Sequence, residues 1–269
     1  MSERPTIGLA LSGGAARGMA HVGVLRAFIE NNIPIDYLTG TSAGSIVAGA
    51  YASGMTIDEI DALGRSLRWR HVGMITMSRF GVQSNVRLEN YLRKRLPVTR
   101  FEDLKLPLAV VATDLKTGTA VVMRDEGDLP LAIRASCTIP GWYVPVTDKD
   151  GRQLVDGGLV AVIPATMCRD LGADIVIAVD VNSAGATFFG ARGPIIGVVL
   201  QAMLVVQKNS SQYQLAASDF VITPQIAHIR WDSLRRAGDL MAAGYAAAME
   251  NIPEILALIE SRSVKSAVL

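Results

Sequence analysis

The sequence predicts an α/β fold around a mostly parallel sheet. Continuous apolar runs of strand length, such as residues 6–12 and 108–113, are typical of strands buried on both faces. These runs alternate with segments of helical periodicity, which is the pattern of βαβ units. The chain has 269 residues, of which 50% are hydrophobic and 19% charged. Such a chain can bury one large core, so we expect a single domain over residues 1–269.

The first elements form a strand, a glycine-rich loop, a helix and a second strand. Residues 6–12 are the first strand, and residues 13–18 follow with the sequence Gly-Gly-Ala-Ala-Arg-Gly. Residues 19–31 carry an apolar helical stripe that ends at two asparagines and Pro34. Residues 35–41 are the second strand. This order is that of a βαβ unit.

The second strand leads into a serine between two glycines. Gly40-Thr41-Ser42-Ala43-Gly44 has the pattern of a nucleophile elbow, a strained strand-to-helix turn that presents a serine side chain above the sheet. The glycines allow the tight turn to close. We therefore infer that Ser42 attacks an acyl group.

The glycine-rich loop opens the first helix and can bind an anion, because it offers several backbone N–H groups and the positive end of the helix dipole. Two kinds of site fit this arrangement. A dinucleotide fold would need an acidic residue at the end of the second strand. Here that strand ends in the serine turn. An oxyanion hole is therefore favoured over a pyrophosphate site, and a nucleotide-binding protein is the weakest alternative.

The middle of the chain continues the α/β pattern. Thr56 and Glu59 form a capping box that begins a helix toward Leu67. Residues 86–96 are a second helix, capped by Ser84 or Asn85 and ended by a proline. Residues 108–113 and 120–123 are neighbouring strands, and Asp114 between them is interpreted as a turn-stabilising carboxylate. Residues 130–136 should be a helix and residues 139–143 a loop.

A second informative turn comes later. A strand ending at Asp156 runs directly into Gly157 and Gly158, which allow close approach to another element. Asp-Gly-Gly is also an ordinary turn, so its meaning depends on Ser42.

The C-terminal third contributes further elements. We expect helices over residues 164–171 and 194–217, a central strand over 173–181 and a last strand over 219–224. Two helices follow, over 234–250 and 252–260. The apolar first half of the 194–217 helix could be core, a dimer contact or a lipid contact, with core as the default. Phe188 and Phe189 could line an entrance or meet a membrane, although such a pair more often packs on the core.

Composition limits the partners and the location. The net charge is only +1, which gives no support for a nucleic acid partner. Residues 65–105 carry ten Lys and Arg against three Asp and Glu, so this segment could face anionic lipid headgroups or form ordinary solvated helix faces. No secretory signal pattern is present, and a cytoplasmic location is expected, with peripheral contact at the inner membrane surface as an option. Cys137 and Cys168 lack metal-ligand spacing and should be buried free thiols.

The motifs together resemble the patatin-like phospholipase family, and in particular its compact bacterial members. The resemblance covers residues up to about 245, which makes 6–245 the expected core, with C-terminal helices around it. It implies a three-layer α/β/α fold that cleaves acyl esters of lipids through a Ser-Asp dyad, without a metal or other cofactor. Carried over by position, Ser42 is the nucleophile and Asp156 the base. The oxyanion loop is Gly13, Gly14 and Ala15, and Arg17 and Gly18 support the loop or an anionic headgroup.

One position departs from the family pattern, which usually has glycine where this chain has Ala15. If that position requires a positive φ, the alanine is strained and the hole is mis-set. If it requires only a small side chain, activity survives.

A dyad also fits the placement of the histidines. A Ser-His-Asp triad in an α/β-hydrolase takes its histidine after the acid, and only His228 follows Asp156. His228 lies in a polar loop and is the weaker option. His21, one turn into the first helix, is more simply a packing or capping residue.

These observations favour a serine acyl-hydrolase acting on phospholipids or related acyl esters. A thioesterase or acyltransferase would use the same residues. A weakly active regulatory or binding protein on the same fold is the alternative from another class.

Overall fold

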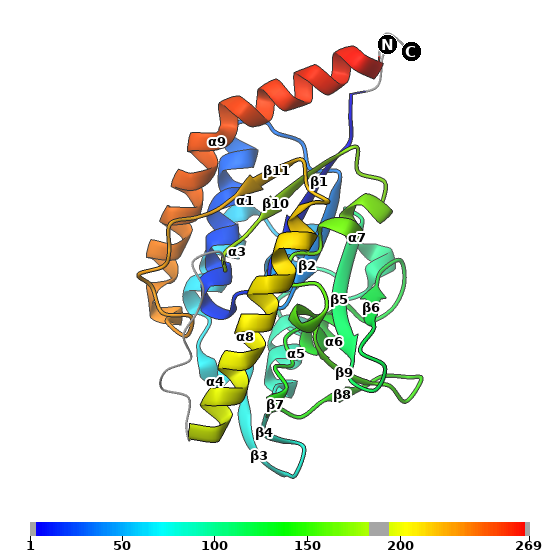
Figure 1. The fold of residues 1–269 in the computed structure, drawn as a ribbon, viewed down its shortest axis with the longest axis vertical. Coiled ribbons are helices and arrows are strands. Elements are labelled where there is room, and N and C mark those ends of the chain that lie inside the picture. The colour runs from blue at the N-terminus through cyan, green and yellow to red at the C-terminus, as the bar shows by residue number, and fades with distance from the viewer. Residues whose placement is uncertain (1–3, 183–193, 267–269) are drawn as a thin grey trace.

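The computed structural model describes residues 4–182 and 194–266, and a large sheet forms its centre (Figure 1). The strand order is β11-β10-β1-β2-β5-β9-β8, with β6 pairing on β5. Neighbouring strands from β11 to β5 are parallel, whereas β6 and β9 are antiparallel to β5, and β8 to β9. The sheet is mostly parallel, as predicted. Its strands are β1 (Ile7–Leu11), β2 (Tyr37–Thr41), β5 (Leu108–Asp114), β6 (Ala120–Met123), β8 (Val146–Thr147), β9 (Gln153–Asp156), β10 (Ile175–Val179) and β11 (Phe220–Ile222).

Helices cover both faces of this sheet, because successive side chains of each strand point to opposite sides. In β1, Ile7, Leu9 and Leu11 join the large core with the helices of one face, whereas Ala10 belongs to a separate apolar cluster with Cys168 of α7. The three-layer α/β/α arrangement is thus confirmed. The helices are α1 (Ala20–Glu30), α2 (Ala43–Ala52), α3 (Ile57–Ser66), α5 (Val86–Arg93), α6 (Leu129–Ser136), α7 (Ala165–Asp170), α8 (Pro194–Leu215) and α9 (Ala237–Ser266).

Several local predictions are confirmed in detail. The Thr56 hydroxyl accepts from the Glu59 N–H at 3.3 Å and the Glu59 carboxylate accepts from the Thr56 N–H at 2.7 Å, which completes the capping box. Asp114 accepts from the Lys116 N–H and the Thr117 hydroxyl, as expected of a turn-stabilising carboxylate. The strand over 173–181 is β10, which pairs with a strand on each side but lies next to the edge strand rather than at the centre.

The two predicted C-terminal helices are one continuous helix, so that prediction was wrong. Pro253 lies inside α9 and removes one backbone hydrogen bond without ending the helix. Tight packing on α1 holds α9 in place. A Cβ on Gly23 would lie 1.9 Å from the Met241 carbonyl oxygen, and one on Gly244 1.9 Å from the Ala20 carbonyl oxygen.

A small second sheet was not predicted. Its order is β3-β4-β7, formed by β3 (Met74–Ser78), β4 (Gly81–Ser84) and β7 (Gly141–Tyr143). Residues 141–143 therefore form a strand where a loop was expected, because they pair with β4, which is distant in the sequence. The short helix α4 (Trp69–Val72) precedes the β3–β4 hairpin. Short 3₁₀ segments are η1 (Ala15–Met19), η2 (Phe101–Asp103), η3 (Gly157–Leu159) and η4 (Leu234–Arg236).

None of the helices in the described ranges combines the length and apolarity needed to cross a bilayer. The paired phenylalanines at 188 and 189 lie outside the described residues.

Candidate active site

Ser42 occupies a strained turn between β2 and α2. Its φ is 50° and its ψ is −122°, values that non-glycine residues rarely adopt. Both flanking glycines are required by space. A Cβ on Gly40 would lie 2.6 Å from the Ser45 Cα, and one on Gly44 would lie 2.2 Å from the Leu11 carbonyl oxygen. The turn therefore has the geometry of a nucleophile elbow.

A second serine fixes this turn from below. The Ser136 hydroxyl, at the end of α6, accepts from the Ser42 N–H at 2.8 Å and donates to the Val111 carbonyl at 2.6 Å. Ser136 is fully buried and was not singled out as a site residue from the sequence. It ties the elbow to β5, and the tertiary pairing that reveals this role is not visible in a single sequence.

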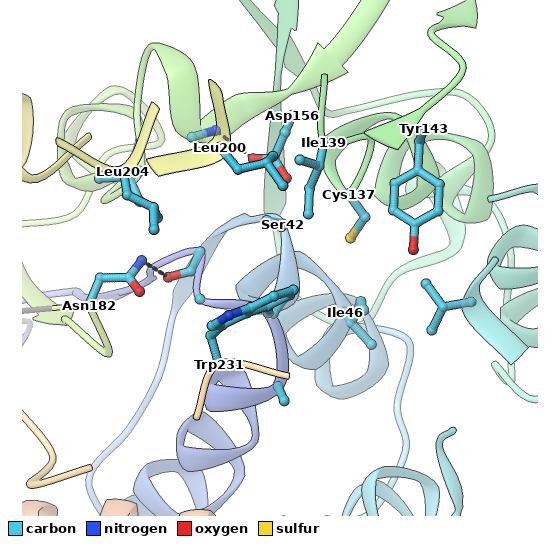
Figure 2. Close-up of a pocket in the computed structure, with 18 of the residues that line it drawn as sticks. Ser42, Ile46, Cys137, Ile139, Tyr143, Asp156, Asn182, Leu200, Leu204 and Trp231 are labelled. Carbon is cyan, nitrogen blue, oxygen red and sulfur yellow. Dashed lines mark hydrogen bonds between the residues drawn. The ribbon is translucent and has the colours of Figure 1, made fainter. Parts of the chain in front are cut away.

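Sheet register brings Asp156 to the level of Ser42. Thr41 of β2 is paired with Val111 of β5, and the next residue of β5, Ala112, is paired with Asp156 of β9. Ser42 follows Thr41, so the two residues lie in one row across β2, β5 and β9. Two strand spacings are about 10 Å, a gap that two side chains leaning toward each other can close. Figure 2 shows Asp156 beside the Ser42 turn.

The Asp156 carboxylate is buried and has few partners. It accepts from the Gly158 N–H at 2.8 Å, and its residue is 5% exposed. Burial raises the pKa of Asp156 to about 6, although hydrogen bonding from the Gly158 N–H and the Ser42 side chain lowers it in part. The turn packs closely on β5, since a Cβ on Gly157 would lie 2.2 Å from the Val111 carbonyl oxygen. A carboxylate with this pKa can accept a proton near neutral pH.

The glycine-rich loop lies beside the elbow and has two backbone donors without an acceptor. The Gly13 N–H donates to the Val162 carbonyl at 3.0 Å, and the Ala16 N–H donates to the Trp231 carbonyl at 2.8 Å. Between them, the N–H groups of Gly14 and Ala15 find no acceptor within residues 4–182 and 194–266. Both residues line the pocket that contains Ser42. Two free adjacent N–H groups next to a nucleophile can bind an oxyanion.

Ala15 has a φ of 50°, so this position does require a left-handed backbone. For an L-residue this conformation costs roughly 1–2 kcal/mol. The strain predicted for an alanine at a positive φ is therefore present. The backbone nevertheless holds it, with Ala16 bonded to Trp231 and the Arg17 N–H to the Gly14 carbonyl at 3.1 Å.

Side chains from distant parts of the chain hold this loop. The Asn182 side-chain amide donates to the Gly13 carbonyl at 2.6 Å (Figure 2). The His21 Nε2 lies 2.8 Å from the Ser12 carbonyl oxygen and donates to it. Burial lowers the pKa of His21 to about 4, so the ring is neutral, and its Nδ1 has no partner among the described residues. Asn182 was missed from the sequence because nothing local marks it.

Arg17 and Gly18 lie behind the loop. Arg17 is buried and its guanidinium donates to the carbonyls of Ile229 and Ala227. It is not among the residues that line the pocket, so its position fits support of the loop rather than contact with a headgroup. Gly18 allows η1 to meet α2, because a Cβ there would lie 2.4 Å from that of Ala43.

The pocket over Ser42 is largely apolar. It encloses about 1010 Å³ including its opening to solvent. One side is formed by α8 through Leu200, Met203 and Leu204, and another by α4 with Trp69 and Val72. Among the described residues that line it, none is a lysine or an arginine. Such a cavity suits an aliphatic chain better than a charged group.

The other candidate residues of the sequence either lie outside the pocket or are not reactive near neutral pH. Cys137 lines the pocket, but burial and the nearby Asp156 charge raise the pKa of its thiol far above neutrality. Cys168 is buried under β1. His228 is exposed, and neither it nor His71 lines the pocket. No group of three or more His, Cys, Asp or Glu side chains in the described ranges is arranged to hold a metal ion.

A serine on a strand-to-helix elbow, with a buried aspartate across the sheet and an apolar pocket above, is the arrangement that the sequence motifs predicted. The sequence comparison is more specific. Residues 9–169 match the family model described as Patatin-like phospholipase, and the chain belongs to that family.

Sequence relatives agree with this assignment, and a solved structure shares the fold. The chain is 40% identical over 198 residues to a patatin-like phospholipase domain-containing protein of Caenorhabditis elegans, covering 67% of this chain and 14% of that protein. It is 36% identical over 188 residues to an uncharacterized NTE family protein of Mycobacterium tuberculosis, covering 69% and 51%. The chain thus spans about half the length of the mycobacterial relative. VipD from Legionella pneumophila has a similar fold, with a TM-score of 0.61, 13% identity, and coverage of 97% of this chain and 67% of VipD.

Proposed function

We propose that this protein hydrolyses acyl esters of phospholipids or related lipids, with Ser42 as nucleophile and Asp156 as its base. The observation that carries the proposal is the shared row of Ser42 and Asp156, which sets a carboxylate with a pKa near 6 beside the elbow. Family membership supports a lipid hydrolase.

The reaction follows from these positions. Asp156 takes the proton of the Ser42 hydroxyl as Oγ attacks the ester carbonyl, and the N–H groups of Gly14 and Ala15 stabilise the resulting oxyanion. Asp156 returns the proton to the departing alcohol, which leaves an acyl ester on Ser42. A water molecule then attacks this ester while Asp156 takes its proton. Collapse returns that proton to Ser42 and releases the fatty acid.

Gly13 has a different part in this proposal from the one expected. Its N–H is already bonded to Val162, so it contributes close packing rather than a donor. A Cβ on Gly13 would lie 3.3 Å from the Ser42 Cβ, a tight contact that would press on the nucleophile. The oxyanion site thus consists of two N–H groups, those of Gly14 and Ala15.

The pocket supports an acyl substrate. Its apolar walls from α4 and α8 can enclose the fatty acyl chain, while the described residues of the lining offer no basic side chain to an anionic headgroup. The headgroup would then remain near the opening. A single patatin-like domain over residues 1–269, a cytoplasmic location and peripheral contact with a membrane surface are part of the same proposal.

The test is labelling by a fluorophosphonate probe, which reacts with activated serines. Wild type should be labelled and Ser42→Ala should not, whereas Ser53→Ala, a buried serine at the other end of α2, should be labelled as wild type. Labelling of Ser42→Ala equal to wild type would contradict the assignment.

Product analysis separates the related activities. Wild type and Ser42→Ala are compared on phospholipid, acyl thioester and short p-nitrophenyl esters. Release of fatty acid from phospholipid supports the hydrolase. Preferential thioester cleavage, or transfer of the acyl group to an added alcohol, would favour the thioesterase or acyltransferase. Probe labelling without turnover on any substrate would favour a regulatory protein.

A further inference from the structure

The β3–β4 hairpin exposes apolar side chains that nothing in the described structure covers. Ile75 is 75% exposed, Met77 is fully exposed and Phe80 is 55% exposed, with Met74 and Val82 exposed beside them. Strand β3 is the edge of the small sheet. Exposed apolar edges favour aggregation unless they serve an interaction.

A second apolar surface lies on α8. Val198, Val199, Val205 and Val206 are exposed, and their spacing of one and seven residues places them on one face of the helix. The opposite face carries Leu200, Met203 and Leu204, which line the pocket. The first turns of α8 and the β3–β4 hairpin lie at the same lower end of the molecule in Figure 1. Helix α4, which directly precedes the hairpin, and helix α8 both contribute walls of the pocket, so each apolar surface lies on or next to an element that lines the cavity above Ser42.

Arginines surround the base of the hairpin. Arg70 precedes β3 and Arg87 follows β4, and the Arg87 guanidinium donates to the Arg70 carbonyl at 3.4 Å. Arg68, Arg70 and Arg95 lie close enough to His71 for their charges to lower its pKa, in addition to the effect of burial. At the hairpin tip, the Arg79 guanidinium lies 5.0 Å from the centre of the Phe80 ring.

These arginines lack carboxylate partners. Elsewhere in the same segment, Arg65 pairs with Asp61 and Arg93 with Glu89 and Asp128. Arg68, Arg70, Arg79, Arg87 and Arg95, in contrast, form no ion pair with any residue of the described ranges. The positive charge expected for residues 65–105 is therefore concentrated around the hairpin and remains available to an external anion.

We propose that the β3–β4 hairpin and the outer face of α8 dock on the surface of an anionic phospholipid bilayer. The apolar side chains would enter the interface and the arginines would contact lipid phosphates, which is the combination that peripheral membrane proteins use. A second copy of the chain fits less well, because a symmetric contact through this surface would bring the same arginines face to face. The proposal deepens the proposed function, because docking would place the pocket opening at the lipid surface. Only the benefit of docking for catalysis rests on the proposed function, since vesicle binding itself does not require hydrolysis.

Binding is measured with full-length Ser42→Ala protein, so that the lipid is not consumed and failure of catalysis cannot be mistaken for failure of docking. Flotation with phosphatidylcholine vesicles, with and without phosphatidylglycerol, should show stronger binding to the anionic vesicles. Adding Met77→Ser and Phe80→Ser should weaken binding on the order of 10–100-fold. Adding Arg70→Gln and Arg79→Gln should weaken it about 25-fold on anionic vesicles only, because each basic residue contributes about fivefold.

Matched controls use side chains of the same kind elsewhere. Leu115→Ser with Val122→Ser replaces two exposed apolar residues near the β5–β6 turn, and Lys116→Gln with Lys149→Gln removes two exposed charges. Both pairs should bind as the parent does. Thermal unfolding should be unchanged in all four proteins because the side chains are exposed.

Several results would overturn the proposal. These are no vesicle binding by the parent, equal loss in the control pairs, or unchanged binding in the Met77 and Phe80 variant. A dimer in solution that Met77→Ser and Phe80→Ser dissociate, without vesicle binding, would assign the surface to a second copy instead. In protein that retains Ser42, Met77→Ser with Phe80→Ser should reduce hydrolysis of vesicle phospholipid but leave hydrolysis of a soluble short-chain ester unchanged.

Discussion

Ser42 and Ala15 have the same φ of 50°, yet the chain holds the two residues in different ways. The elbow depends on its own glycines, Gly40 and Gly44, and on one distant hydrogen bond, from the Ser42 N–H to Ser136 at a sequence separation of 94. The glycine-rich loop is held from afar, by Asn182 at a sequence separation of 169 and by the Arg17 contact with Ile229 at a separation of 212. The turn of Ser42 therefore rests mainly on a local glycine motif, whereas the loop that carries the Gly14 and Ala15 N–H groups depends on segments far away in the sequence.

The largest expected effect comes from replacing Asp156, the proposed base, while the elbow and the glycine-rich loop stay intact. Asp156→Asn should lower turnover on the order of 10⁴-fold, since a neutral amide cannot take the Ser42 proton. In wild type, turnover should fall as the pH drops below about 6, as Asp156 becomes protonated. An unchanged rate in Asp156→Asn would remove this residue from the reaction.

The same variant should be more stable than wild type. The folded pKa of Asp156 is raised above its unfolded value of 3.8, so the folded state bears the cost of a buried charge that appears as pH rises from about 4 to about 6. Asp156→Asn should gain at most about 3 kcal/mol above pH 6 and nothing below about pH 4, as judged by unfolding at both pH values. Asp114→Asn is the control with opposite sign. Hydrogen bonds, first from the Lys116 N–H, lower the pKa of Asp114, so its loss should destabilise the fold near neutrality.

The next effect breaks the loop alone. Ala15→Val places a β-branched residue at a positive φ, which should shift the Gly14 and Ala15 N–H groups and lower turnover on the order of 10²–10³-fold. Ala15→Gly should keep activity and change the free energy of unfolding by no more than about 1 kcal/mol, because the relieved backbone strain is offset by unfolded-state entropy. Full activity in Ala15→Val would show that the loop does not supply the donors.

The third expected effect is a loss of stability when a side chain is added at a glycine of the elbow. Gly44→Ala would bring a Cβ to 2.2 Å from the Leu11 carbonyl oxygen, which is backbone and cannot move aside. We expect a loss of more than about 3 kcal/mol in chemical denaturation. Gly49→Ala in the same helix meets only the flexible end of Ile133 at 2.7 Å, so it should be nearly neutral. Similar losses in both variants would mean that any side chain added to a glycine of α2 lowers the free energy of unfolding, whether or not it lies at the elbow.

The smallest expected effect comes from removing one hydrogen bond that holds the glycine-rich loop. Asn182→Ala removes the donor to the Gly13 carbonyl and should lower kcat by about tenfold, with little change in KM, since the loop loses one hydrogen bond but keeps its contacts to Trp231 and Ile229. Asn31→Ala, whose amide bonds within α1 far from the pocket, should leave kcat unchanged. A purely structural role for Asn182 would lower thermal stability without altering kcat.

The contrast also explains what could be predicted from the sequence. Seven strands of the large sheet, most helices, the capping box and the turn at Ser42 follow from patterns within a few residues, and the structure contains them. Ser136, Asn182 and the β3–β4–β7 sheet were not predicted, because each acquires its place only through pairing with distant segments. Pro253 misled the prediction of the C-terminus, since packing of α9 on α1 outweighs its helix-breaking tendency.

The alignment of Ser42 with Asp156 has a consequence for how the protein acquires activity. The two residues reach one level only after β2, β5 and β9 have associated in a single register, and a slip of β9 by one position would turn Asp156 to the other face of the sheet. If Ser42 and Asp156 act together as proposed, a newly synthesised chain cannot be active until its central strands have associated.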